Sequence, residues 1–218
     1  MSIQLAIFDL DGTLIDSRQD LANAVNATRA HMGLGPLDNE RVYSYVGHGA
    51  PELIRRSLGK AATDAEISSG TKFFLAHYRA HVLDYTTLYP GVKGSLEHLH
   101  DAGKRMAVLT NKPEGMSRAI VEGLGVAGYF FRVYGGDSLE TRKPDPLGAE
   151  ALMKEAGSTR AATVMVGDSS VDVLTARNAG IACCAVTYGF QPETLADPAP
   201  DLLVDQMEQV VEWILSRP

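Results

Sequence analysis

Apolar residues recur at every third or fourth position through residues 17–85, a spacing that indicates amphipathic helices rather than strands. Leu21, Val25 and Met32, for example, fall on one face of a helix that begins near residue 17. We expect helices over residues 17–32, 39–46, 51–58 and 64–83, and no strand between them. The pattern therefore predicts a separate, all-helical unit.

The rest of the chain alternates short apolar runs with helical segments. The apolar runs have the length and residue types of buried strands, and they lie at 5–8, 105–110, 130–134, 163–166, 181–187 and 202–204. Helical spacing appears between and after them, at 92–102, 113–124, 146–156, 170–179 and 207–215. Strands joined by helices of this length pair in parallel through right-handed crossovers. We therefore expect an α/β fold with a parallel sheet, helices on both faces, and the helical unit inserted after the first strand.

Composition and charge exclude several classes of protein. The chain is 45% hydrophobic and 22% charged, as ordinary globular domains are, and its net charge of −7 disfavours binding to nucleic acid. It has no run of 18 apolar residues, so we expect no membrane span. Its N-terminus lacks the pattern of a secretion signal. The only cysteines, Cys183 and Cys184, are adjacent in an apolar run, which favours two buried small residues in a cytoplasmic protein.

The first apolar run ends in an unusual group of polar residues. Asp9 and Asp11 follow it, and Gly12 and Thr13 come next. Two carboxylates at the end of a strand repel each other, and a divalent cation with oxygen ligands removes that repulsion. Asp-x-Asp alone fits an acidic turn equally well, but the preceding apolar run and the following Gly-Thr favour a metal site.

Polar residues also follow the later strands. Thr110 and Asn111 come at the end of the strand 105–110, and Asp168 and Asp172 follow the strand 163–166. Lys143 precedes a helix. Because the carboxyl ends of parallel strands lie along one edge of a sheet, we expect these side chains to meet those of the first strand. Carboxylates suit a magnesium ion, and lysine and threonine suit a phosphate, so the sequence predicts a site for both.

The acidic residues at this edge can each be given a chemical role. Asp9, fixed at the end of a strand, can attack a phosphoryl group and carry it as an aspartyl phosphate. Asp11, on the turn, can protonate the leaving oxygen and then deprotonate water. Asp168 completes the protein ligands of the ion, and Asp172 either orients those ligands or binds the ion directly.

Lys143 and Thr110 complete the expected site. Lys143 would neutralise the charge of the phosphate and the nucleophile, and Thr110 would donate a hydrogen bond to a phosphoryl oxygen. Taken alone, Lys143 is typical of a solvated loop lysine and Thr110 of a strand-end cap. Their order along the chain and their expected place at one edge favour the site.

The four polar segments, in this order, resemble the motifs of the haloacid dehalogenase-like hydrolase superfamily. They are Asp9-Leu10-Asp11-Gly12-Thr13, Thr110-Asn111-Lys112-Pro113, Lys143-Pro144 and Gly167-Asp168-Ser169-Ser170-Val171-Asp172. The resemblance covers essentially the whole chain, and the ordered set is highly specific. Within the superfamily the chain is similar to the phosphoglycolate phosphatase-like subfamily, through the segments Val46–Ala50, Leu109–Pro113, Arg142–Pro146 and Thr187–Gly189.

This resemblance implies a fold, a cofactor and a reaction. The fold is a Rossmann-like parallel sheet core over residues 1–15 and 88–218, with an inserted all-helical cap domain over 16–87. The reaction is magnesium-dependent hydrolysis of a small phosphate monoester, 2-phosphoglycolate first among them, through an aspartyl phosphate. The implied catalytic residues are Asp9, Asp11, Thr110 and Lys143, and the implied metal ligands are Asp9, Asp168 and the backbone carbonyl of Asp11.

Several relatives remain as alternatives. Asp11 argues against a dehalogenase, which needs no acid for a leaving group. Phosphonate-cleaving relatives use a cap lysine, but neither Lys60 nor Lys72 lies in a loop that resembles that site. Phosphosugar mutases of the β-phosphoglucomutase kind share every core motif, and pyrophosphatases and sugar phosphatases also belong to this superfamily. A non-catalytic phosphate-binding protein is disfavoured because no motif residue is missing.

Substrate contacts are expected from two places. In the cap, the segment Gly47-His48-Gly49 could approach the far end of a small anion, although a plain interhelical turn fits it equally well. In the core, Gly12, Thr13 and Asn111 flank the expected site. The expected partner is a small anionic phosphate ester, with no nucleic acid and no membrane, and the chain is expected to be a monomer or a homodimer.

Overall fold

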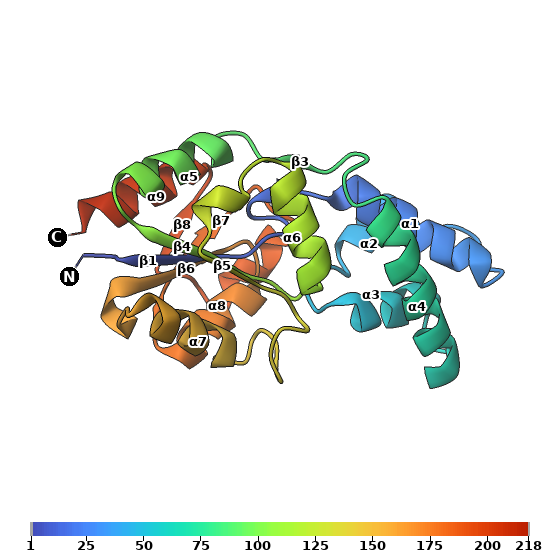
Figure 1. The fold of residues 1–218 in the computed structure, drawn as a ribbon. Helices are drawn as coiled ribbons and strands as arrows, with labels where there is room; N and C mark the ends of the chain where they lie inside the picture. Colours follow the sequence, from blue (N-terminus) through green and yellow to red (C-terminus); the bar gives the residue numbers. More distant parts are fainter. Residues whose placement is uncertain (1, 218) are drawn as a thin grey trace. The chain divides into compact units, whose positions relative to one another are not determined.

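A computed structural model describes residues 2–217 of the chain, which form two compact units (Figure 1). The helical unit is Ser17–Thr87, and the core unit is the remainder, up to Asp16 and from Leu88 onward. The insert expected from the sequence was 16–87. The helical unit is thus an uninterrupted segment, whereas the core unit is assembled from both sides of it.

The core unit contains one six-stranded sheet in the order β5-β4-β1-β6-β7-β8. Every neighbouring pair is parallel. The strands are β1 (Leu5–Phe8), β4 (Arg105–Leu109), β5 (Arg132–Tyr134), β6 (Thr163–Gly167), β7 (Ala182–Val186) and β8 (Leu202–Val204). The expected α/β class with a parallel sheet is confirmed.

Helices cover both faces of this sheet (Figure 1). On one face lie α5 (Val92–Asp101) and α9 (Met207–Ser216), and on the other lie α7 (Leu147–Ala156) and α8 (Ser170–Ala179). The remaining helix, α6 (Glu114–Gly123), packs beside β5. Alternate residues of a strand point to opposite faces, so Leu5 and Ile7 of β1 join the core beneath α7 and α8.

The strand order places a topological switch at β1. From β1 the chain builds outward to β4 and β5 on one side, and then to β6, β7 and β8 on the other. In parallel sheets, ligands bind outside the carboxyl ends of the strands at the point where the order reverses. The carboxyl end of β1, with those of β4 and β6 beside it, is therefore where the fold favours a site.

The helical unit consists of α1 (Arg18–His31), α2 (Asn39–Tyr43), α3 (Ala50–Leu58) and α4 (Asp64–Ala80). Its core is apolar, with Ile54, Phe74 and Tyr78 almost fully buried. The start of α4 is fixed by a capping box, in which Thr63 and Glu66 each accept a hydrogen bond from the other's backbone N–H. All four helices correspond to those expected from the apolar spacing.

The structure corrects the sequence pattern in two respects. Two strands of two residues each, β2 (Ile15–Asp16) and β3 (Thr87–Leu88), pair with each other where the chain leaves and re-enters the core unit. They were not expected, because two residues are too few to show a periodicity. The ends of several elements also shift by one to three residues; α4, for example, ends at Ala80 rather than at 83.

Candidate active site

Asp9 lies immediately after β1 and is largely buried, with 8% of its surface exposed. The backbone N–H of Leu10 donates to Oδ1 of Asp9 at 2.7 Å, and Nζ of Lys143 lies 2.9 Å from the same oxygen. Burial raises the pKa of Asp9 to about 6; the charge of Lys143 opposes this rise, and that of Asp172 adds to it. Both contacts engage Oδ1 of Asp9.

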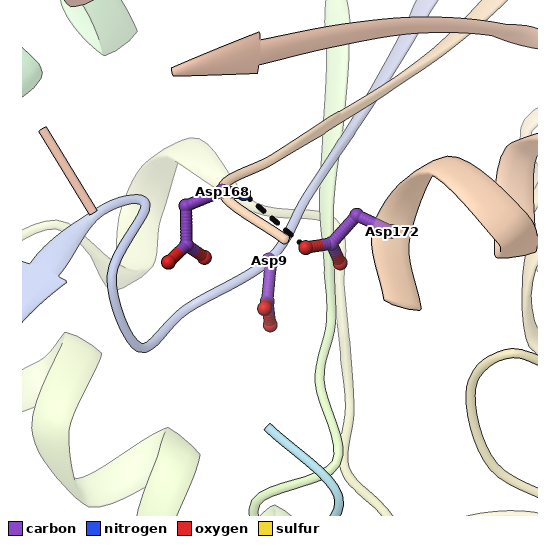
Figure 2. Close-up of side chains that lie close together, drawn as sticks. All are labelled: Asp9, Asp168 and Asp172. Atoms are coloured by element: carbon purple, nitrogen blue, oxygen red, sulfur yellow. Dashed lines mark hydrogen bonds between the residues drawn. The ribbon is translucent and has the colours of Figure 1, made fainter. Parts of the chain in front are cut away.

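Three buried carboxylates converge at the switch point. Asp9, Asp168 and Asp172 each offer an oxygen, and these oxygens all lie within 4.8 Å of one another (Figure 2). Burial, followed by the charges of Asp172 and Asp9, raises the pKa of Asp168 well above its ordinary value. Carboxylates packed so closely away from water are unfavourable unless a cation joins them, and oxygen ligands are those that magnesium prefers. The residues present therefore fit a divalent ion.

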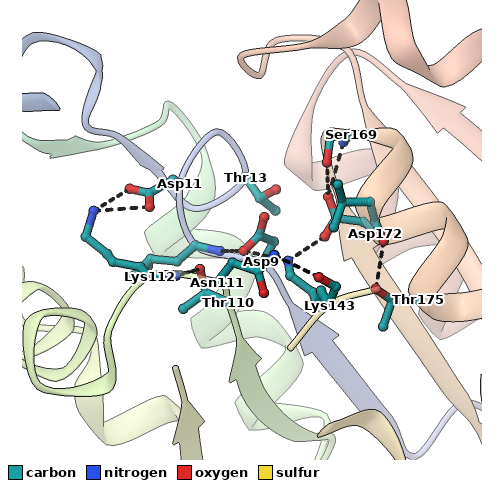
Figure 3. A network of polar contacts seen from close by, with 12 residues as sticks. Asp9, Asp11, Thr13, Thr110, Asn111, Lys112, Lys143, Ser169, Asp172 and Thr175 are labelled. Carbon is teal, nitrogen blue, oxygen red and sulfur yellow. Dashed lines mark hydrogen bonds and ion pairs between the residues drawn. The ribbon is translucent and has the colours of Figure 1, made fainter. Parts of the chain in front are cut away.

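The three carboxylates differ in their hydrogen bonds, and this difference indicates which of them would bind a metal ion directly. Oδ1 of Asp172 accepts from Nζ of Lys143 at 2.6 Å, and its Oδ2 accepts from the backbone N–H of Asp168 and from both the N–H and the hydroxyl of Ser169 (Figure 3). The side chain of Asp172 is fully buried and already satisfied. Asp9 and Asp168 are thus the better direct ligands, and Asp172 orients the loop that carries Asp168.

Asp168 is held in a close-fitting enclosure. Its Oδ1 accepts from the hydroxyl of Thr13 at 3.2 Å, and its Oδ2 accepts from the backbone N–H of Phe190 at 2.7 Å. Gly12, at a φ of +84°, leaves room for it, because a Cβ there would lie 2.2 Å from Oδ2 of Asp168. Gly189 is equally close, because a Cβ there would lie 2.2 Å from Cβ of Asp168. The structure places both Gly12 and Thr13 against Asp168, and their expected contact with substrate stays a prediction.

Lys143 is buried rather than solvated, although the sequence placed it in a loop. Its side chain is 2% exposed, and Nζ lies between Asp9 and Asp172. Burial alone would lower its pKa, but the charges of Asp172 and Asp9 outweigh that effect and raise the pKa of Lys143 above its ordinary value. The side-chain amide of Asn111 donates to the backbone carbonyl of Lys143 at 3.0 Å and so fixes the lysine loop.

Asp11 forms an ion pair with Lys112, which was not expected from the sequence. Nζ of Lys112 lies 2.8 Å and 3.1 Å from the two carboxylate oxygens of Asp11 (Figure 3). The side chain of Lys112 is only 3% exposed, and that of Asp11 is 13% exposed. Thr110, just before this pair, is buried, and its Oγ1 accepts from the backbone N–H of Lys112 at 3.3 Å. The one available signal for Lys112 was its position directly after Thr110-Asn111.

Two further residues support the site from β7 onward. The hydroxyl of Tyr188 donates to the backbone carbonyl of Thr13 at 2.9 Å, and the ring of Tyr188 packs against Tyr89 with centroids 4.6 Å apart. Phe190 contributes its backbone N–H to Asp168. A backbone donor leaves no mark in the sequence, whereas Tyr188 lies in the segment Thr187–Gly189, which the resemblance to the subfamily had already singled out.

The remaining expected residues belong to the helical unit. Gly47, His48 and Gly49 form the turn between α2 and α3, where Gly47 and Gly49 have φ angles of +111° and +86°. Such angles are adopted readily only by glycine, so the turn requires both residues. The expected contact of this turn with substrate stays a prediction.

Comparison with known proteins adds independent findings. The family model for haloacid dehalogenase-like hydrolases matches residues 6–186. The chain is 42% identical to the phosphoglycolate phosphatase of Chromobacterium violaceum, over 86% of each chain, and 40% identical to that of Rhodospirillum rubrum, over 95% of this chain and 89% of the relative. Its structure is similar to a crystal structure of a predicted phosphoglycolate phosphatase from Haemophilus somnus, with a TM-score of 0.92, 31% identity and 98% of each chain covered.

Within residues 2–217, no helix has both the length and the apolar content needed to span a bilayer. The matched family model covers most of the chain, and the two relatives named above are matched over 86% and 89% of their own length. The chain therefore belongs to the haloacid dehalogenase-like hydrolases and is a phosphoric monoester hydrolase of their phosphoglycolate phosphatase-like branch.

Proposed function

We propose that this phosphatase is magnesium-dependent and hydrolyses a small phosphate monoester, with 2-phosphoglycolate as the leading substrate, through an aspartyl phosphate on Asp9. One observation carries the proposal: Asp9 lies at the switch point, next to Asp168 and beside the buried cation of Lys143. The substrate is supported by the names of relatives up to 42% identical. A cytoplasmic location is part of the same proposal.

Asp9 and Asp168, with the backbone carbonyl of Asp11, would hold the magnesium ion, and Asp172 would orient Asp168. When bound, the ion supplies positive charge that offsets the repulsion between a carboxylate nucleophile and a phosphate dianion. The other requirements of the reaction fall to side chains of this chain.

In the first half of the reaction, Oδ2 of Asp9 attacks phosphorus, and the bond from phosphorus to the ester oxygen breaks. The contacts from Leu10 N–H and Lys143 to Oδ1 fix the carboxylate so that Oδ2 faces the substrate. The leaving oxygen takes a proton from Asp11, which gives the alcohol. For this step Asp11 must release Lys112 and carry a proton.

In the second half, Asp11 accepts a proton from water, and the water oxygen attacks the phosphorus of the aspartyl phosphate. The bond from phosphorus to Oδ2 breaks, inorganic phosphate leaves, and Asp9 is regenerated as a carboxylate. Lys143 stabilises the negative charge that develops on the phosphoryl oxygens, and the hydroxyl of Thr110 donates to one of them. Asn111 acts indirectly, by holding the loop of Lys143.

Phosphate release from a panel of small phosphate monoesters tests this function. We expect turnover of 2-phosphoglycolate that depends on added magnesium, and none for the Asp9→Asn variant. Wild-type turnover by Asp9→Asn would exclude the covalent route. Conversion of a sugar 1-phosphate into its isomer without release of phosphate would instead identify a mutase, which has the same core motifs.

A further inference from the structure

A second hollow lies in the core unit, at the amino end of the sheet and away from the carboxylate cluster. It has a volume of about 310 Å³ and is bounded by the end of α5, the start of β4 and the short 3₁₀ helix η1 (Ala127–Tyr129). Three residues of β4, 107–109, separate its lining from Thr110, a span of about 13 Å along the strand from Met106. No residue assigned above to the phosphatase site lines it.

The hollow is basic in a chain that is acidic overall. His100, Lys104 and Arg105 line it, and none of its lining residues is acidic, whereas the whole chain carries a net charge of −7. Nζ of Lys104 contacts only a neutral oxygen, Oγ of Ser2 at 3.2 Å. Such cations gathered in a concave site without a carboxylate attract an anion.

Arg105 is also available to a ligand. Its Nη1 donates to a backbone carbonyl, that of Ala156, at 3.3 Å. The carboxylate of Glu155 lies within electrostatic reach of Arg105 but is paired with Arg132 at 2.7 Å. Among residues 2–217, neither Lys104 nor Arg105 forms an ion pair, so their charges are not neutralised within the core unit.

Aromatic rings form the rest of the hollow. Tyr129, Phe130 and Phe131 all line it, and each is partly exposed. Phe130 is anchored against Phe8, with ring centroids 6.4 Å apart. The guanidinium of Arg105 stacks over the ring of Phe131, 4.3 Å from its centroid, so a cation and an aromatic surface occupy the same wall.

We propose that this hollow binds a nucleoside phosphate, whose base packs against the aromatic rings and whose phosphate contacts Lys104 and Arg105. A simple phosphate would leave the exposed parts of the three rings uncovered, and a neutral aromatic compound would leave the cations unpaired. A ligand with both a planar ring and a phosphate satisfies both sets of groups. The volume is at the lower end of that found for small-molecule sites. This inference is independent of the substrate proposed for the phosphatase site.

Binding of adenosine 5′-monophosphate, measured by isothermal titration calorimetry in EDTA to prevent turnover, tests the proposal. The double variant Lys104→Ala/Arg105→Ala removes both cations, and Lys93→Ala removes an exposed cation at the start of α5, which does not line the hollow. We expect saturable binding to the wild type, an affinity at least about tenfold weaker for the double variant, and no change for Lys93→Ala. Equal affinity of the double variant and the wild type, or no saturable binding to the wild type at millimolar concentration, would refute the site.

The two halves of the ligand are tested separately. Adenosine and ribose 5-phosphate should each bind more weakly than adenosine 5′-monophosphate, and Tyr129→Leu should weaken the nucleotide more than ribose 5-phosphate. If ribose 5-phosphate binds as tightly as the nucleotide, the base makes no contribution and the proposal is wrong. The phosphatase activity of each variant shows that it is folded, because none of the changed residues lies near Asp9.

Discussion

The two units of this protein bury different kinds of side chain. The core unit buries Asp9, Lys143 and Asp172 together, whereas the largest fully buried side chains of the helical unit include Phe74 and Tyr78. Burying charges is unfavourable unless they are paired, and such arrangements are typical of sites that carry out chemistry. The proposed chemistry of this phosphatase therefore depends on buried, paired charges of the core unit. The stability of the helical unit depends mainly on apolar packing.

The helical unit has one exception that sharpens the comparison. Asp20, in the first turn of α1, is 1% exposed and accepts hydrogen bonds from the backbone N–H groups of Tyr85 and Thr86 and from the hydroxyl of Thr86. These donors come from the end of the same unit. This buried carboxylate ties the two ends of the helical unit together and has a structural role.

The largest effect is expected from Asp9→Asn. Loss of the proposed nucleophile should lower kcat by at least about 10³-fold, as measured by phosphate release. The same variant should be at least as stable as the wild type in EDTA, because it removes a buried charge from the cluster. An Asp9→Asn variant that retained activity would show that the buried carboxylate of the core unit is not the nucleophile, and the contrast between the two units would lose its main support.

The stability of the metal-free protein should depend on pH through the same residue. The pKa of Asp9 rises from 3.8 to about 6 on folding, so the folded state holds this proton more tightly than the unfolded state does. Stability should therefore fall as pH increases from about 4 to about 6, and the loss should level off above that range. In thermal unfolding in EDTA, the melting temperature of Asp9→Asn should rise relative to that of the wild type as pH increases across this range. If the difference in melting temperature between the two proteins did not change with pH, the raised pKa of Asp9 would be contradicted.

Lys143→Met should lower both activity and stability. Removing the lysine leaves Asp9 and Asp172 buried without a cation to pair with, at a cost of about 3–5 kcal/mol. Unfolding in urea measures this loss, and the double variant Lys143→Met/Asp172→Asn should recover part of the stability but none of the activity. If Lys143→Met were as stable as the wild type, the charges of Asp9, Lys143 and Asp172 would not form a buried network.

Asp20→Ala tests the helical unit. It leaves the donors of Tyr85 and Thr86 unpaired and should destabilise the protein by about 2–3 kcal/mol. Asp64→Ala, at an exposed position in the first turn of α4, serves as the matched control and should change stability little. If Asp20→Ala also lowered kcat as strongly as changes at the core site do, a purely structural role for Asp20 would be wrong.

Lys112→Met tests the ion pair with Asp11. Because Lys112 positions the proposed acid and base, kcat should fall by about tenfold, with a smaller change in KM. Lys154→Met removes an exposed lysine from α7 and should have no effect. An unchanged kcat in Lys112→Met would mean that the pair does not matter for turnover.

The smallest effect is expected from His48→Ala in the turn between α2 and α3. If this residue contacts the far end of the substrate, KM for 2-phosphoglycolate should rise severalfold while stability stays unchanged. His98→Ala, an exposed histidine of α5, is the control. An unchanged KM would mean that the side chain of His48 makes no contact with the substrate.

Much of this protein could be predicted from its sequence, because the relevant signals are local. The apolar run at 5–8 and the polar residues after it predicted both a buried strand and a site at its end. The order of the polar segments predicted that Asp9 and Asp168 would meet, since the carboxyl ends of parallel strands share one edge. The apolar spacing of residues 17–85 predicted every helix of the helical unit.

Only the tertiary structure decided which groups contact which. It placed Lys143 between Asp9 and Asp172, gave Asp11 its partner Lys112, and set Gly12, Thr13 and Gly189 around Asp168. Thr13 and Asp168 are 155 residues apart, and Asp11 and Lys112 are 101 apart. Periodicity and local motifs report the residues that each element presents, but a hydrogen bond between distant segments depends on the packing of all the elements between them.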